Sequence, residues 1–244
     1  MSTEKDLTKY ALLLEYNGKD FNGSQTQPNG RTIQEELEKG LAILLKTAVK
    51  TIFSGRTDSG VHAHGQVVHF VTIEKLDPYA FLYSLNALLP GDMAVREIQK
   101  VPSDFCSRKS AIKRWYRFTI YNQRYKTALN DMCFHYSHPL EEKKIHRFLQ
   151  YILGTHDFSS FRAANSDTPS SVCTIYKVQC TREGNYIHID IVADRYLYNM
   201  IRILVGTILQ GILKSKPENY LKQVLLAKDR SEEHTSELQS LSHI

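Results

Sequence analysis

The ten-residue segment 54–63 (SGRTDSGVHA) carries a carboxylate, a guanidinium and an imidazole. Asp58 lies two residues after Arg56 and four before His62, with a glycine on either side at positions 55 and 60. Apolar runs before and after the segment predict two strands, so the chemistry-bearing residues occupy a turn on a rigid support. Glycines let a ligand approach the backbone closely. A carboxylate near an arginine in a basic protein indicates chemistry on a polyanion, although an aspartate after a strand is usually a turn former.

Two residues far along the chain are further candidates. Tyr116 shares one face of a predicted strand with Phe118 and Ile120. It is either a core residue or an aromatic platform for a base, with a phenol available for proton transfer. Arg202 interrupts an apolar helical stripe, so its guanidinium either reaches water or meets a buried anion such as Asp58. The sequence alone leaves both alternatives open.

A basic stripe with interleaved aromatic residues leads into the strand that carries Tyr116. Its members are Lys109, Lys113, Arg114, Trp115, Tyr116 and Arg117. Such a stripe suits RNA, because phosphates attract the cations and bases stack on the rings. A solvated strand face is the alternative interpretation.

Three histidines, His62, His64 and His69, raise the question of a metal, since an HxH pair on a strand can share a face. No carboxylate or cysteine accompanies them at a compelling ligand spacing, and His69 alternates with apolar neighbours as in a half-buried strand. We therefore expect no metal. The four cysteines form no CxxC pair, which fits reduced thiols in the cytoplasm better than a disulfide framework or a zinc site.

Composition favours a folded cytoplasmic protein with an anionic partner. The 244 residues are 42% hydrophobic, enough for one large domain or two smaller ones. We expect neither a transmembrane helix nor a secretory signal, because the chain has no long apolar run and residues 1–10 are charged. Residues 1–230 hold 31 Lys and Arg against 23 Asp and Glu. This excess favours nucleic acid as a partner, although a merely basic protein fits the charge equally well.

The apolar periodicity predicts an α+β protein in two halves, residues 1–106 and 107–230. Strands are predicted at 10–16, 49–54, 66–73, 93–98, 113–121, 174–179 and 186–193. Helices are predicted at 78–89, 141–153 and 197–213, and behind the capping box formed by Thr32 and Glu35. Gly184 and Asn185 predict the turn of a hairpin.

Residues 231–244 do not follow this pattern. They have no apolar periodicity, and the run RSEEHTSELQS at 230–240 resembles one reading frame of a widely used sequencing adapter. We expect a non-native, disordered tail; a short acidic tail is the alternative.

Several ordered motifs resemble the TruA family of tRNA pseudouridine synthases. The resemblance runs from about Leu12 to Arg230 and rests mainly on SGRTDSGVHAHGQVVHF around Asp58. It is supported by EYNGKDFNG at Glu15, QPNGRTIQEELE at Gln27, NALLP at Asn86, RWYRFTIYN at Arg114, GTHDFSSFRA at Gly154 and YNMIRILVGTIL at Tyr198.

The resemblance implies a fold and an activity. The fold would be two α+β halves around a continuous mixed, mostly antiparallel sheet, with helices on one side and a catalytic cleft between the halves. The activity would be isomerisation of uridine to pseudouridine at positions 38 to 40 of the tRNA anticodon stem-loop, on a base flipped out of its stack. Family members act as homodimers and need no metal or organic cofactor.

The resemblance also implies residue roles. Asp58 matches the catalytic aspartate, which either attacks the sugar or abstracts a ribose proton. Tyr116 matches the tyrosine that stacks on the target base, and Arg202 the arginine that pairs with the aspartate and would keep it ionised despite burial. Arg56 would hold the RNA with its base extruded. The remaining expected substrate contacts are Arg114, Gln27, Asn29 and His62.

The chain departs from the family pattern at several positions. Ser24 stands in place of the usual tryptophan, Cys106 and Ser107 replace a His-Ala pair, and Cys173 replaces an arginine. The family normally continues past residue 230 into a further strand, so we expect a truncated chain that is less stable than a complete member or inactive. The alternatives are a non-catalytic tRNA-binding remnant and a metal-dependent hydrolase that uses His62 and His64.

Overall fold

The structure, a computed structural model, describes residues 7–129, 132–163 and 170–228. The chain divides into two compact units, Met1–Ala111 and Ile112–Ile244, each with its own hydrophobic core. The division predicted between residues 106 and 107 lies in the same connecting stretch, between the last strand of the first unit and the first strand of the second. The tail predicted at 231–244 lies outside the described residues. No helix in the described part of the chain is long and apolar enough to cross a membrane.

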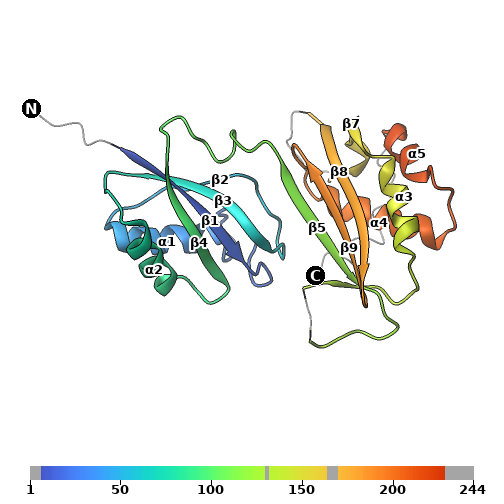
Figure 1. Cartoon of the computed structure of the whole chain (residues 1–244), viewed down its shortest axis with the longest axis horizontal. Helices are drawn as coiled ribbons and strands as arrows, with labels where there is room; N and C mark the ends of the chain where they lie inside the picture. Colours follow the sequence, from blue (N-terminus) through green and yellow to red (C-terminus); the bar gives the residue numbers. More distant parts are fainter. Residues whose placement is uncertain (1–6, 130–131, 164–169, 229–244) are drawn as a thin grey trace, which may run out of the picture. The chain divides into compact units, whose positions relative to one another are not determined.

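The first unit is a four-stranded antiparallel sheet with the strand order β2-β3-β1-β4 (Figure 1). Its strands are β1 (Thr8–Tyr16), β2 (Ile52–Phe53), β3 (Ala63–Thr72) and β4 (Met93–Val101). Every second residue of β1 is buried, because alternate side chains of a strand point to the same face. These side chains join those of the helices in a single core.

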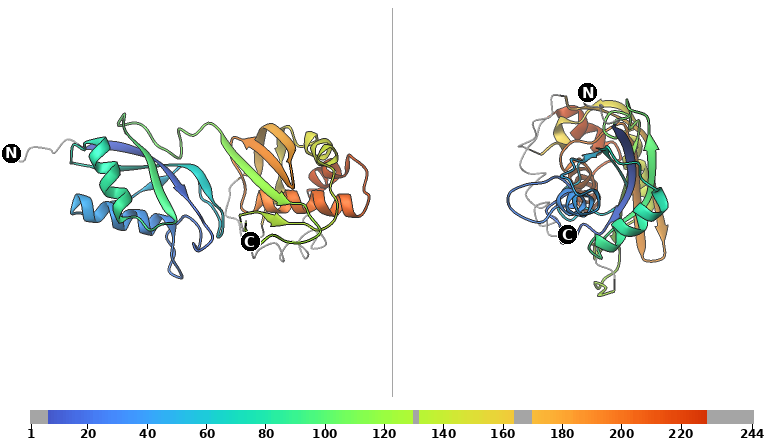
Figure 2. Two further views of the ribbon diagram at one scale, coloured as in Figure 1. Left: turned by 60° about the horizontal axis from the view of Figure 1, so that its bottom comes forward. Right: turned by 90° about the vertical axis from the view of Figure 1, so that its left-hand side faces the viewer.

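Two helices, α1 (Ile33–Leu45) and α2 (Pro78–Leu88), pack on the sheet of the first unit (Figures 1 and 2). Thr32 caps α1 by accepting a hydrogen bond from the Glu35 amide at 3.3 Å, as the capping box predicted. Asp77 caps α2 in the same way, and Pro78 occupies the first turn, where no amide is needed. Local sequence signals therefore determine where both helices begin.

The second unit is a five-stranded sheet with the order β6-β5-β9-β8-β7. Its strands are β5 (Arg114–Tyr121), β6 (Phe134–His135), β7 (Gly154–Asp157), β8 (Val172–Glu183) and β9 (Tyr186–Ala193). Only the short β5–β6 pair is parallel, so the sheet is mixed and mostly antiparallel, as predicted. The predicted hairpin joins β8 to β9 through Gly184, whose positive φ of 55° suits a tight turn.

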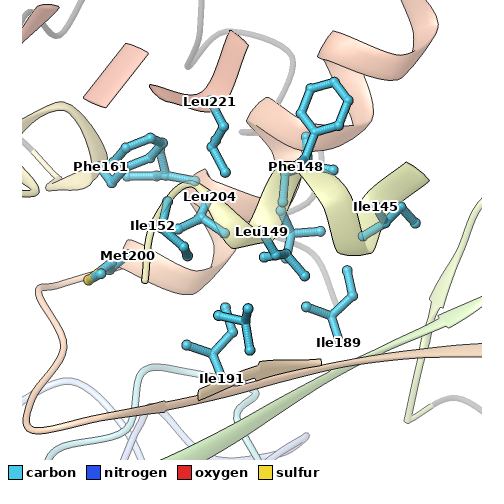
Figure 3. Packing of buried hydrophobic residues seen from close by; sticks show 14 of the residues in the cluster. Ile145, Phe148, Leu149, Ile152, Phe161, Ile189, Ile191, Met200, Leu204 and Leu221 are labelled. Atoms are coloured by element: carbon cyan, nitrogen blue, oxygen red, sulfur yellow. The ribbon is translucent and has the colours of Figure 1, made fainter. Parts of the chain in front are cut away.

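The helices of the second unit cover one face of its sheet. They are α3 (Glu142–Gln150), α4 (Met200–Leu213) and α5 (Tyr220–Ala227), with a 3₁₀ turn, η1 (Ser159–Phe161). Figure 3 shows Ile189 and Ile191 of β9 pointing from the sheet toward Leu149 of α3 and Leu204 of α4. All four side chains are at most 1% exposed, so this layer forms the centre of the core.

The α+β class is confirmed, and helices lie on one side of each sheet, with two differences in the predicted elements. The described strands form one sheet in each unit, and the continuity of the sheet between the units stays a prediction. The strand predicted at 49–54 shortens to β2, since pairing with β3 covers only two residues. The helix predicted at 197–213 begins at Met200, because Asn199 adopts a left-handed conformation with φ 58°. Strands β6 and β7 and helix α5 were not predicted.

Candidate functional site

The segment around Asp58 is a loop, residues 54–62, between β2 and β3. Its base is closed by the Ser54 amide, which donates to the Val67 carbonyl at 2.8 Å. The Gln66 side chain lies 2.5 Å from the Ser54 hydroxyl and donates to the Gly55 carbonyl at 2.8 Å. Gln66 is buried, so the first two residues of the loop are held from inside the sheet. We call this segment the Asp58 loop.

Thr57, immediately before Asp58, is anchored through its amide, its carbonyl and its hydroxyl. Its amide donates to the Ser24 hydroxyl at 2.8 Å, and its carbonyl accepts from the Ser24 amide at 3.0 Å. Its own hydroxyl lies 2.8 Å from the phenol oxygen of Tyr16, at the end of β1. Burial raises the pKa of Tyr16, so the phenol is protonated at neutral pH and can donate.

A second loop, residues 17–24, packs against the Asp58 loop. A side chain at Gly18 would place its Cβ only 2.0 Å from the Val61 carbonyl oxygen, so the close approach requires glycine. The Phe21 carbonyl accepts from the Ser59 hydroxyl at 3.2 Å and from the Gly60 amide at 3.4 Å. The motif at Glu15 and the motif around Asp58 are therefore two sides of one contact.

Asp58 is half-buried on this support, and Arg56 is exposed. His62 accepts a hydrogen bond at Nδ1 from the Gly18 amide at 3.1 Å. A neutral ring that accepts at Nδ1 carries its proton on Nε2, so the loop can present a donor there. The arrangement offers a carboxylate for acid–base or nucleophilic work and an exposed cation for a phosphate.

Gln27 and Asn29 lie in an exposed loop that Asn22 closes. The Gln27 side chain donates to the Asn22 carbonyl, and the Asn22 side chain donates to the Asn29 carbonyl at 2.6 Å. The loop ends at Arg31, which forms a bidentate ion pair with Asp92 at 2.6 and 2.9 Å. The hydrogen bond to Asp92 raises the pKa of Arg31. This pair stabilises the loop that carries the two predicted substrate contacts.

Tyr116 lies half-buried on β5, in edge contact with the ring of Tyr196 at a centroid distance of 4.7 Å. The Tyr196 hydroxyl donates to the Ile191 carbonyl at 2.7 Å. Burial, followed by the neighbouring Tyr116, raises the pKa of Tyr196 well above its ordinary value. Tyr196 is thus a fixed, neutral support for the Tyr116 ring.

Arg114 and Arg202 also belong to the second unit. Arg114 donates to the Asp194 carbonyl, next to the end of β9. Asp194 accepts at Oδ1 from the Thr174 and Arg195 amides at 2.8 and 2.7 Å, which holds this turn. Arg202 lies half-buried in the first turn of α4, beside the buried Ile203.

Four members of the basic aromatic stripe, Arg114, Trp115, Tyr116 and Arg117, lie on β5, where alternate side chains point to opposite faces of the sheet. Asp190, only 8% exposed, accepts from the Trp115 indole at 2.8 Å and from Arg117 Nε and Nη2 at 2.8 and 3.0 Å. The Lys113 ammonium lies 5.1 Å from the Tyr176 ring centroid. Trp115 and Arg117 are exposed, but both donate to the buried Asp190, which favours the structural interpretation for these two residues.

Each unit thus holds a subset of the predicted site residues. The first unit brings the Asp58 loop against residues 17–24, and Gln27 and Asn29 lie in the loop that follows. Tyr116, Arg114 and Arg202 belong to the second unit. The pairing of Asp58 with Arg202 stays a prediction.

Sequence reasoning did not identify Tyr16, Arg31, Asp92 or Tyr196 as supports for the candidate site residues. The first three lie within or next to quoted motifs, so their position in those motifs was the available signal. Tyr196 lies outside them.

No cluster of three or more histidines, cysteines or acidic residues that could hold a metal occurs among residues 7–129, 132–163 and 170–228. Of the three histidines considered as ligands, His69 is buried and accepts at Nδ1 from the Ser107 amide at 3.1 Å. His62 accepts from Gly18, and His64 is exposed. A hydrolase that uses His62 and His64 therefore has no ligand cluster in the described residues.

Comparison with known proteins gives one family. The chain matches the tRNA pseudouridine synthase family over residues 13–108 and 148–241. A protein named tRNA pseudouridine synthase A from Cronobacter sakazakii is 39% identical over 231 residues, covering 94% of this chain and 86% of the relative. Proteins of the same name from Shigella boydii and Escherichia coli are 39% identical over 234 residues, covering 95% of this chain and 87% of each relative.

Proposed function

The chain belongs to the tRNA pseudouridine synthase family, and we propose that it isomerises uridines at positions 38 to 40 of the tRNA anticodon arm with Asp58 as its catalytic carboxylate. Enzymes of this family are isomerases. The observation that carries the proposal is the anchoring of the Asp58 loop: Ser24 and Tyr16 hold Thr57, and Phe21 holds Ser59. A catalytic group needs such support, because small displacements of a reacting atom cost large factors in rate.

The reaction requires little beyond positioned acid–base groups. The N1–C1′ glycosidic bond of uridine breaks, the base rotates, and a C5–C1′ bond forms. The proton on C5 is lost and N1 gains one, so atoms and electrons balance without an oxidant or a phosphoryl donor. Asp58 acts on the ribose, either as a nucleophile at C1′ or as a base toward a ribose proton.

The other predicted residues supply binding and charge. Tyr116 stacks on the flipped base, which offsets part of the cost of a few kcal/mol for leaving the helical stack. The fixed edge contact with Tyr196 supports this role. Arg202 supplies the positive charge that keeps Asp58 ionised, and the exposed Arg56 contacts phosphate. Arg114, Gln27, Asn29 and His62 complete the proposed RNA contacts.

The test uses an unmodified anticodon stem-loop labelled with tritium at C5 of its uridines. Pseudouridine formation exchanges that hydrogen with water, so release of tritium reports the C5–C1′ step directly. We expect release with the unmutated chain and none with Asp58→Asn, which keeps the size of the side chain and removes its charge. Binding without release by the unmutated chain would favour a non-catalytic tRNA-binding protein instead. Release of free uracil or cleaved RNA would favour a hydrolase.

The homodimer implied by the family resemblance and the cytoplasmic location expected from the cysteine pattern belong to the same proposal. Light scattering of the purified chain should give twice the chain mass of 28.1 kDa. A mass equal to one chain, with full tritium release, would remove the dimer from the proposal.

A further inference from the structure

Ser24 occupies an unusual place between α1 and the Asp58 loop. It is 1% exposed. Its carbonyl accepts from the Gln34 amide of α1 at 3.0 Å. Its own amide and hydroxyl face Thr57, where the hydroxyl accepts from the Thr57 amide at 2.8 Å and lies 3.4 Å from the Thr57 carbonyl oxygen. One residue therefore links the start of a helix, through its backbone carbonyl, to the residue before Asp58, through its amide and hydroxyl.

The contact between Ser24 and Thr57 fixes the orientation of the backbone immediately before Asp58. The carbonyl of Thr57 and the amide of Asp58 belong to the same planar peptide group. The Ser24 amide holds that carbonyl at 3.0 Å, and the Ser24 hydroxyl holds the peptide group on the other side of Thr57. With both peptide groups of Thr57 held, the backbone has little freedom to turn the Asp58 side chain away.

The neighbours of Ser24 leave little room for another arrangement. Gly23 has φ 83°, and a Cβ there would lie 2.9 Å from the Thr57 carbonyl oxygen. Tyr16, 3% exposed, holds the Thr57 hydroxyl from the sheet at 2.8 Å. Thr57 is thus bounded by β1 on one side and by residues 23–24 on the other. Loss of the Ser24 hydroxyl would leave the Thr57 amide without the acceptor described here, and an unpaired buried amide destabilises the conformation that contains it.

We propose that Ser24 is a positioning residue for Asp58, and that its hydroxyl sets the backbone geometry from which the carboxylate reaches the ribose. The inference rests on the proposed function of Asp58. It predicts that Ser24 acts on the chemical step more than on RNA binding, because the hydroxyl is buried and contacts the protein backbone.

The experiment compares two buried serines of the first unit. Ser107 is 2% exposed, and its hydroxyl donates to the Ile52 carbonyl at 2.5 Å, at the start of β2. It makes no described hydrogen bond to the Asp58 loop. Ser24→Ala should lower kcat for tritium release about tenfold with KM within about twofold. Ser107→Ala should lower stability and leave kcat within about twofold, and Ser24→Thr, which keeps the hydroxyl, should regain most of the lost rate.

Amide hydrogen exchange supplies a readout besides activity. The Thr57 amide should exchange at least about tenfold faster in Ser24→Ala than in the unmutated chain or in Ser107→Ala, since it loses its acceptor. Circular dichroism and urea unfolding confirm that each variant is folded at the assay temperature. If Ser24→Ala is folded and keeps the kcat of Ser107→Ala, the positioning role is wrong.

Failure of the proposed function has a different signature. It appears in the unmutated chain as absence of tritium release, or in Asp58→Asn as undiminished release. Failure of the positioning role appears only in Ser24→Ala, while the unmutated chain is active and Asp58→Asn is not.

Discussion

Asp58 and Asp190 occupy different kinds of position, a loop and a strand. Asp190 is buried on a strand, and its carboxylate itself accepts three hydrogen bonds from Trp115 and Arg117. Asp58 is half-buried in a loop that is anchored through the residues on either side, Thr57 and Ser59. The Asp190 carboxylate thus connects Trp115 to Arg117, and the described side-chain anchors beside Asp58 are on Thr57 and Ser59.

The difference also separates two arginines, Arg56 and Arg117, each of which carries the charge that RNA would attract. Arg56 lies two residues before Asp58 in the sequence, whereas Arg117 meets Asp190 through the pairing of β5 with β9. The guanidinium of Arg117 donates two hydrogen bonds to the Asp190 carboxylate, and this hydrogen bonding raises the pKa of Arg117. Both arginines are exposed, but an ion pair is described for Arg117 and none for Arg56. The position of a charge in the fold, more than its presence in a basic stripe, indicates which arginine is available to a ligand.

The largest expected effect comes from exchanging the carboxylate on the loop. Asp58→Asn should lower the rate of pseudouridine formation on the order of 10³-fold or more, because the reacting charge is removed. The urea midpoint should change little, since asparagine has the size of aspartate and the hydrogen bonds of Thr57 and Ser59 are unchanged. If Asp58→Asn formed pseudouridine at the rate of the unmutated chain, the proposed catalytic role of Asp58 would be wrong.

The corresponding change on the strand should act on stability. Asp190→Ala removes the acceptor for Trp115 and Arg117, and we expect the free energy of unfolding to fall by about 2 kcal/mol. Urea unfolding measures this loss. The rate per folded molecule should remain near that of the unmutated chain. A stable but inactive Asp190→Ala would place the Asp190 network in the reaction and break the comparison.

The two arginines give a matched test of RNA binding, as each substitution removes one positive charge. Arg56→Ala should weaken stem-loop binding several-fold and reduce the slope of log K against log salt by about one. Arg117→Ala should leave that slope nearly unchanged. Filter binding between 50 and 200 mM salt measures both. If the slope of log K against log salt fell equally in the two variants, Arg117 would contact RNA phosphate as much as Arg56 does, despite its ion pair with Asp190.

The smallest expected effect is on the pH dependence of stability, through His69 on β3, one of the two strands that flank the Asp58 loop. Burial, and then the charge of Lys9, lowers the pKa of His69 on β3, so folding favours the neutral ring. The neutral Nδ1 accepts from the Ser107 amide. This contribution to stability is complete above the unfolded pKa of about 6.5 and is lost as the pH falls through the lowered folded value.

His69→Gln should therefore show a shallower decline of the urea midpoint between pH 7 and pH 5 than the unmutated chain. His64→Gln, at an exposed position on the same strand, is the control and should keep the original decline. If the urea midpoint declined equally with pH in all three proteins, protonation of His69 would not be what destabilises the fold.

Local patterns predicted most elements because their signals are local. Thr32 and Pro78 mark the starts of two helices, and alternation of apolar residues marks β5 and β9. The short strands β6 and β7 contain too few residues for a period of two to be visible. The sequence could not show the order in which the strands pair in each sheet, because that order depends on which apolar faces pack together.

The candidate site was predictable only in part, for a related reason. The residue types around Asp58 identified the loop, but Ser24 and Thr57 are 33 residues apart and no periodicity connects them. Arg117 and Asp190 are 73 residues apart and become neighbours only because β5 pairs with β9. Which side chains become partners across the fold depends on packing. A sequence motif can identify such residues, but it does not show which contacts they make.

The support of the Asp58 loop has a consequence for the order of folding. Its described hydrogen bonds connect residues between Tyr16 and Val67, and the widest of them, from Gly18 to His62, spans 44 residues. Contacts of short sequence separation form early, and the N-terminal part of a chain folds first during synthesis. The Asp58 loop can therefore assemble in the nascent chain before the codons for Tyr116 and Arg202 have been translated.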